Sequence, residues 1–157
     1  MEDGHAGHRH DDRYGIAAAL ETAGAVDGVL DTGVDKNHNF LSGKVISEAC
    51  YSTTGSLSTS LCPGGAPSST ATDSGLNCPV TTSGCKHGTH VAGIVSGNGS
   101  ASSNAYRGIV AGANLVSLRT LDEEGRGVSS DTIAAMDWLL GHGSDYNIKV
   151  VNLSLGK

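Results

Sequence analysis

Residues 25–33 read AVDGVLDTG, an apolar segment that runs into an aspartate and then a glycine turn. The valines and the leucine favour a β-strand that ends at Asp31, although Asp27 and Gly28 interrupt it. A buried Asp27 without a partner would be costly unless it were protonated. Either the strand begins at Val29, or this part of the chain has diverged. Asp31 stands at the carboxyl end of the strand, where parallel α/β sheets place their chemistry.

Strand and helix patterns alternate along the rest of the chain. Alternation of this kind predicts an α/β fold with a mainly parallel sheet and helices on both faces. The helix over 132–140 has Ser129 and Ser130 as candidate N-caps, and Gly141 and Gly143 are expected to end it. The last strand is continuously apolar and suits burial on both faces. The expected strands are 44–49, 114–121 and 149–153, and the expected helices are 90–96 and 132–140.

Size and composition restrict the classes of protein that fit. The chain has 157 residues, the size of one domain, and 38% of them are apolar. No apolar run approaches the roughly 20 residues of a membrane-spanning helix. The chain has ten Lys and Arg and 16 Asp and Glu, which gives a net charge of −6, and aromatic residues make up only 4%. We therefore expect no membrane and no nucleic acid as partner.

The chain divides into a polar start and a domain over 24–157. Residues 1–23 form a polar extension with His5, His8 and His10, which we expect to be poorly ordered. A metal-binding tail is the less favoured interpretation of these histidines. The extension has no apolar core of the kind found in a signal peptide.

Four cysteines lie in an unusual stretch at about 50–85. Ser, Thr, Gly and Pro fill 23 of the 35 positions from 51 to 85, so no regular element is expected there. The cysteines predict a surface insertion closed by two disulfides, and hence a secreted or periplasmic protein, with four reduced thiols as the alternative. Three pairings are open, and a cross-link near His87 either positions that residue or only tethers the loop. The candidates are Cys50, Cys62, Cys78 and Cys85.

A second motif, HGTHVAG, occupies residues 87–93. It places an imidazole at the start of a helix whose following residues are small. A buried Asp that accepts from one nitrogen of a His fixes the tautomer, so that the other nitrogen can take a proton from a serine. The order Asp31, then His87, then a later serine is one of the known orders of this triad.

These motifs resemble those of the subtilisin-like serine proteases, in the N-terminal part of their catalytic domain. The resemblance covers roughly residues 24–156 and implies the subtilisin-like three-layer fold, here truncated. It implies a serine endopeptidase with Asp31 and His87 as the catalytic Asp and His. The matching segments are VLDTG (29–33), HGTHVAG (87–93), GIVAGAN (108–114), LDEEGRG (121–127) and VNLSLG (151–156).

The resemblance also implies how a peptide or protein substrate would bind. An extended substrate strand would lie between two edges of the cleft, with Leu121 and Leu155 helping to wall its pockets. The family needs no cofactor, and a structural calcium ion is common in it, but no calcium site can be assigned here. A complete protein would be a monomer. The two edges are Gly125 with Gly127, and Ser154, Leu155 and Gly156.

The nucleophile is missing from this sequence. None of its serines lies in a context that matches the family's serine motif; Ser144 precedes Asp and Tyr, and Ser154 belongs to the substrate edge. The chain alone is therefore expected to be an inactive fragment.

Two alternatives from other classes stay open. One is a non-catalytic peptide-binding remnant that keeps the cleft. The other, less favoured, is a zinc-binding module built on Cys85, His87 and His90, a set of donors that zinc accepts.

Overall fold

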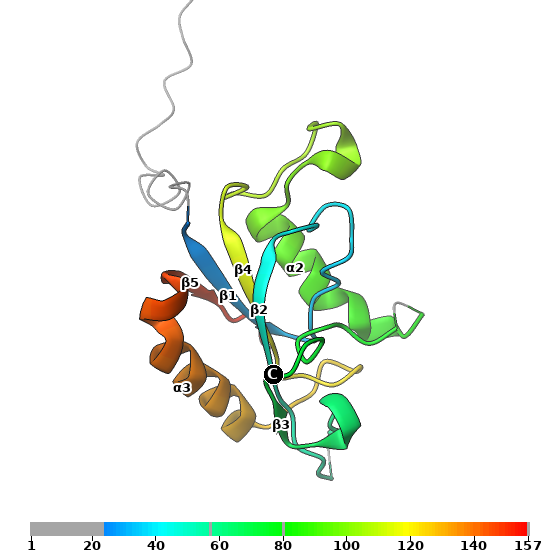
Figure 1. The fold of residues 1–157 in the computed structure, drawn as a ribbon. Helices are drawn as coiled ribbons and strands as arrows, with labels where there is room; N and C mark the ends of the chain where they lie inside the picture. The colour runs from blue at the N-terminus through cyan, green and yellow to red at the C-terminus, as the bar shows by residue number, and fades with distance from the viewer. Residues whose placement is uncertain (1–23, 57, 80, 157) are drawn as a thin grey trace, which may run out of the picture.

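The computed structural model describes residues 24–56, 58–79 and 81–156 (Figure 1). The polar extension expected over 1–23, with its three histidines, lies outside the described residues. Among the described helices, none is long and apolar enough to span a membrane.

In this part of the chain, a five-stranded sheet has the order β3-β2-β4-β1-β5. Strand β4 is central and pairs in parallel with β2 and with β1, and β1 also pairs in parallel with β5. Only the short β3 runs antiparallel, against β2. The sheet is therefore mainly parallel, as predicted. The strands are β1 Val26–Asp31, β2 Val45–Tyr51, β3 Ser68–Ser69, β4 Asn114–Arg119 and β5 Ile148–Asn152.

Two helices cover the opposite faces of this sheet (Figure 1). Helix α2, His87–Ser96, packs Val91 and Ala92 against Val29 of β1. Helix α3, Ser129–Tyr146, packs Leu139 against the other face. Alternate side chains of β1 and β4 pack into these two apolar cores, because successive residues of a strand point to opposite faces. The result is a three-layer α/β structure.

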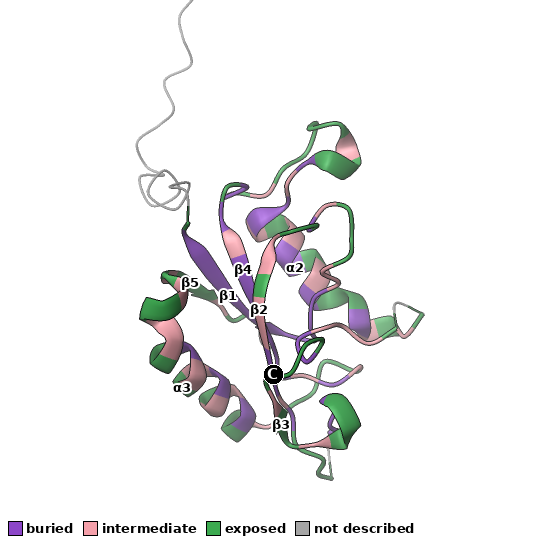
Figure 2. Ribbon diagram, viewed as in Figure 1, coloured by how far each residue is buried: buried purple, intermediate pink, exposed green. Residues whose placement is uncertain are grey.

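Strand β1 is the most deeply buried element, and all six of its residues are inaccessible to solvent (Figure 2). The strand begins at Val26, which agrees with the strand expected over 25–31, and the alternative start at Val29 was wrong. Asp27 is consequently enclosed, with 1% of its surface exposed, and neither carboxyl oxygen has a hydrogen-bond partner among the described residues. Burial raises the pKa of this carboxyl group.

Helix α3 is longer than the sequence indicates. It starts at Ser129 after Val128, with no side-chain cap, so the serine caps were wrong. It also continues through Gly141 and Gly143, which cost helical stability. Three stacked rings, one turn apart, span these glycines and offset that cost: Trp138, His142 and Tyr146. The helix ends at Tyr146 and is followed by Asn147, a left-handed residue with φ 56°.

Strand β5 is less buried than its apolar sequence alone suggests. Its apolar sequence suggested burial on both faces, yet Val150 and Val151 are each 38% exposed. Within the described ranges, only one edge of β5 is paired, to β1. The strand lies at the outer edge of the sheet, so its apolar side chains are only partly covered.

The cysteine-containing stretch has little regular structure, as expected. It contains the two-residue β3 and the 3₁₀ turns η2, Pro63–Gly65, and η3, Ser83–Lys86. A further 3₁₀ turn, η4, covers Ser100–Ser102 after α2. Both 3₁₀ turns of the stretch lie beyond the carboxyl ends of the strands, toward the end of the sheet that carries Asp31 (Figure 1).

Candidate functional site

The carboxyl end of β1 delivers Asp31 to the point where the sheet meets α2. Its side chain is fully buried, and Oδ1 accepts the backbone N–H of Thr32 at 2.7 Å. Its carbonyl oxygen accepts the N–H groups of Thr120 and Leu121 from the neighbouring chain segment. Asp31 is therefore fixed on both its backbone and its side chain.

His87 opens helix α2 and lies directly against this carboxylate. Its Nδ1 is 2.8 Å from Asp31 Oδ1 and 2.9 Å from Oδ2. An ionised carboxylate can only accept hydrogen bonds, so the proton of the neutral imidazole is on Nδ1. Nε2 is then the unprotonated nitrogen, and the half-exposed ring can accept a proton there.

Glycine at position 88 is what allows this approach. A Cβ on Gly88 would collide with the carbonyl oxygen of Gly33 and would touch the Asp31 side chain. The N–H of Gly88 donates to Thr32 Oγ1 at 3.1 Å. The small residues of the HGTHVAG motif thus let α2 begin in contact with the end of β1.

The two histidines of the motif have different surroundings. His90, one turn further along α2, is exposed and lines a separate cavity of about 510 Å³ on the outer side of the helix. That cavity also contains Asp35, His38 and Arg107. Only His87 of the pair contacts Asp31.

A cleft of about 420 Å³ lies beside His87. It brings together segments that are far apart in the sequence, since its walls come from the Leu121 segment, the turn before α2 and the residues after β5. Six of the predicted site residues line it: His87, Leu121, Gly125, Ser154, Leu155 and Gly156. Asp31 lies behind His87 and does not line the cleft, and Gly127 is also outside the lining.

Sequence reasoning missed three residues of the cleft. Thr32 and Gly84 are neighbours of predicted residues along the chain, and Glu124 belongs to the quoted LDEEGRG segment. The signal for Glu124 was therefore present in the motif. The signal for Gly84 was not, because only the folded insertion brings it to the cleft.

The two proposed edges of the cleft are organised locally. Gly125 has φ +74°, a left-handed conformation that favours glycine in the turn it occupies. The hydroxyl and the N–H of Ser154 both donate to Asn152 Oδ1, at 2.7 and 3.1 Å. The Ser154 hydroxyl therefore donates its hydrogen bond to a residue of the same edge of the cleft.

The cysteines form two disulfides, Cys50–Cys62 and Cys78–Cys85. The structure selects this pairing from the three that the sequence left open. Cys85 is buried in η3, immediately before α2. As a disulfide partner it supplies no thiolate, which removes one donor of the zinc alternative. Among the described residues, no group of three or more His, Cys, Asp or Glu is arranged to hold a metal ion.

A buried arginine connects the sheet to the insertion. Arg119 pairs in register with Asp31 across β4 and β1. Its Nη1 donates to the carbonyl oxygens of Leu61, at 3.3 Å, and Leu76, at 3.0 Å. Burial lowers the pKa of this guanidinium, and the charge of Glu123 opposes the shift. The insertion is therefore bonded to the same end of the sheet that carries Asp31.

Comparison with known proteins gives curated relatives that match part of the chain. Serine protease AprX of Bacillus subtilis is 37% identical over 73 residues, which are 45% of this chain and 16% of AprX. Halolysin of Haloferax mediterranei is 43% identical over 70 residues, 45% of this chain and 12% of halolysin. Subtilisin-like protease 5 of Arthroderma benhamiae is 37% identical over 76 residues, 46% of this chain and 17% of that protein. Each match spans less than a fifth of the relative.

Solved structures match more of the chain. Sphericase superposes with a TM-score of 0.65 at 25% identity, and S41 psychrophilic protease with 0.61 at 28%. Each alignment covers 86% of this chain and 38% of the solved chain. The predicted subtilisin-like fold is confirmed. A family model described as the subtilase family, Peptidase_S8, matches residues 22–157. The chain belongs to the subtilase family.

Proposed function

We propose that this chain carries the general base and its orienting carboxylate, His87 and Asp31, for a serine endopeptidase. The observation that supports this most directly is the pair of contacts from His87 Nδ1 to the two Asp31 oxygens, at 2.8 and 2.9 Å. The nucleophilic serine would come from sequence outside residues 1–157. Without it, the chain alone would turn over no peptide.

The proposed chemistry is acyl transfer on a peptide bond. His87 Nε2 takes the proton of the serine hydroxyl as its oxygen attacks the peptide carbonyl carbon. The imidazolium that forms keeps its Nδ1–H on Asp31, which stays ionised and stabilises the positive charge. His87 then gives the proton to the leaving amine as the C–N bond breaks. Water repeats the cycle on the acyl-enzyme and releases the acid.

The substrate is a peptide or protein segment in an extended conformation. It would lie in the cleft between Gly125 and the edge over 154–156, where backbone hydrogen bonds supply affinity. No cofactor takes part. The two disulfides support work in an oxidising compartment, outside the cell or in a periplasm.

The two motif histidines provide the test. In the protease translated from the full reading frame that contains this chain, His87→Ala should reduce kcat/KM on an extended peptide anilide by at least about 10³-fold. His90→Ala is the matched control, because His90 is exposed and does not contact Asp31. It should stay within about threefold of the parent. Equal losses in both variants would refute the assignment of His87.

The 157-residue chain alone gives a second measurement. It should bind an extended peptide and release no product from it. If the full-length protein also binds peptide but hydrolyses none, the molecule is a peptide-binding remnant and the endopeptidase proposal fails.

A further inference from the structure

The cysteine insertion contacts the segment that forms one wall of the cleft. This segment, residues 121–128, joins β4 to α3 and is called here the cleft loop. It supplies Leu121, Glu124 and Gly125 to the cleft lining. A buried aspartate lies near each end of it: Asp122 at the start, and Asp131 in the first turn of α3.

Asp122 holds the turn of the cleft loop together. Its Oδ1 accepts the N–H groups of Glu124 and Arg126, both at 2.9 Å. Its own N–H donates to the carbonyl oxygen of Arg126 at 2.7 Å. Its second oxygen, Oδ2, accepts the N–H of Thr59 in a longer contact of 3.4 Å. One carboxylate therefore shapes the turn and joins it to the insertion.

Asp131 makes the corresponding connection at the other end. Its Oδ2 accepts the N–H of Thr53 at 2.7 Å, and its Oδ1 accepts the Thr53 hydroxyl at 2.8 Å. Thr53 and Thr59 belong to one short segment of the insertion. We define this segment, residues 52–56 and 58–61, as the insertion arm.

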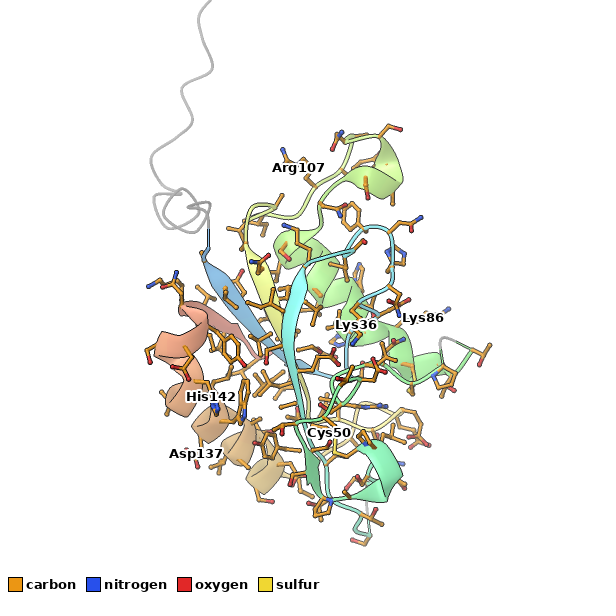
Figure 3. All side chains as sticks on the ribbon, in the orientation of Figure 1. Lys36, Cys50, Lys86, Arg107, Asp137 and His142 are labelled. Carbon is orange, nitrogen blue, oxygen red and sulfur yellow. A yellow bond between two sulfur atoms is a disulfide. The ribbon has the colours of Figure 1, made fainter. Side chains whose placement is uncertain are left out.

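The insertion arm has internal contacts of its own. Ser58 Oγ donates to the carbonyl oxygen of Thr53 at 2.9 Å, and the N–H of Ser60 donates to Thr54 Oγ1 at 3.0 Å. The buried disulfide Cys50–Cys62 closes its base, and Figure 3 shows Cys50 beside the end of β2. A segment fixed in this way can orient the loop that it contacts.

We propose that the insertion arm is a positioning element that holds the cleft loop in the conformation that binds extended peptide, with Thr53 and Thr59 as its positioning residues. The inference rests on the proposed function, since it assigns the cleft to peptide. A loop fixed before binding loses less conformational freedom when substrate arrives. The arm therefore contributes to affinity for long substrates and leaves the Asp31–His87 pair unchanged.

Hydrogen exchange on the 157-residue chain tests the contact itself. Thr59→Pro removes the N–H that Asp122 accepts, whereas Thr59→Ala keeps it. Thr53→Val removes the hydroxyl that Asp131 accepts, whereas Thr53→Ser restores it. In the Pro and Val variants the Glu124 and Arg126 amides should exchange about threefold to tenfold faster, the effect of losing one hydrogen bond. The Thr32 amide should not change. Unaltered Glu124 and Arg126 exchange in both variants would overturn the inference.

Kinetics of the full-length protease test the consequence for substrate. Thr53→Val should raise KM for a long peptide about threefold to tenfold, with kcat within twofold and a single-residue ester unaffected. Thr53→Ser should recover the parent KM. Asp137→Ala, on the outer side of α3 in Figure 3, is the control and should change neither constant. Equal effects on long and short substrates would refute positioning.

The two experiments separate the inference from the proposed function. Hydrogen exchange needs no catalysis, so it reports on the insertion arm even if the protein proves to have no protease activity. Faster exchange with an unchanged KM for long peptides would overturn the positioning role while leaving the endopeptidase proposal intact.

Discussion

Two aspartates of β1, Asp27 and Asp31, are equally buried but have opposite surroundings. The four-residue spacing places them on the same face of the strand. Asp31, at the carboxyl end, accepts hydrogen bonds from Thr32 and from His87. Asp27, nearer the amino end, lies in register with Leu115 and Val150, and in the part of the chain that the structure describes neither of its oxygens has a partner.

The difference shows that burial alone does not give a carboxylate the hydrogen-bond partners that a catalytic role needs. At the carboxyl end of the sheet, the chain leaves β1 and α2 arrives with polar groups that can be aimed at Asp31. Further back, β1 has strands on both sides and an apolar layer above it. A carboxyl group there meets no donor, and burial favours its neutral form. We therefore expect the two positions to contribute in opposite ways to function and stability.

The largest expected contrast is in catalysis. Asp31→Asn in the full-length protease should lower kcat by about 10⁴-fold, because an amide N–H facing Nδ1 favours the wrong imidazole tautomer. Asp27→Asn should stay within about threefold, since Asp27 does not contact the His87 ring. Steady-state hydrolysis of a peptide anilide measures both. Comparable losses of kcat in the two variants would contradict the assignment of a catalytic role to Asp31 alone.

The next largest expected effect is on stability, which should increase when Asp27 is replaced by an apolar residue. Asp27→Val fills the same space without a carboxyl group to desolvate, so it should raise the free energy of unfolding by about 1–3 kcal/mol. Urea denaturation at pH 7 measures this change. Asp137→Val, at an exposed position of α3, is the control and should shift stability by less than about 0.5 kcal/mol. A loss of stability in Asp27→Val would reveal a favourable contact that the carboxyl group makes.

The smallest effect is a pH dependence confined to Asp27. Burial raises its pKa above the ordinary value of 3.8, so the folded state keeps a proton that the unfolded state releases. Relative to Asp27→Asn, the parent chain should keep constant stability below pH 3.8. It should lose stability as the pH rises from 3.8 through the folded pKa, and then level off. Urea titrations of both proteins from pH 3 to 8 give this difference, and a flat difference would contradict it.

The accuracy of the sequence predictions depends on whether a pattern is local. The strand over 25–31 and the helix in the HGTHVAG motif follow from side-chain size and periodicity, and both are present. The end of α3 was wrong because Gly141 and Gly143 were judged by propensity alone. The rings of Trp138, His142 and Tyr146 stack on one another only once the helix has formed, and this stacking offsets the cost of the two glycines. The exposure of β5 also differs from what its apolar sequence suggests. The burial of a strand depends on which elements pack against it, and not only on its own residues.

Local chemistry in the sequence was enough to determine the fold class, the family resemblance and the candidate pair Asp31 and His87. Those residues occur in short motifs whose glycines and small side chains permit only a few arrangements. The tertiary structure alone decided the disulfide pairing, the orphaned state of Asp27 and the contact between the insertion arm and the cleft loop. Each of these joins residues that are distant in the chain or depends on what lies around them. These features arise only when the chain folds and sets distant segments side by side, and no local sequence pattern shows them.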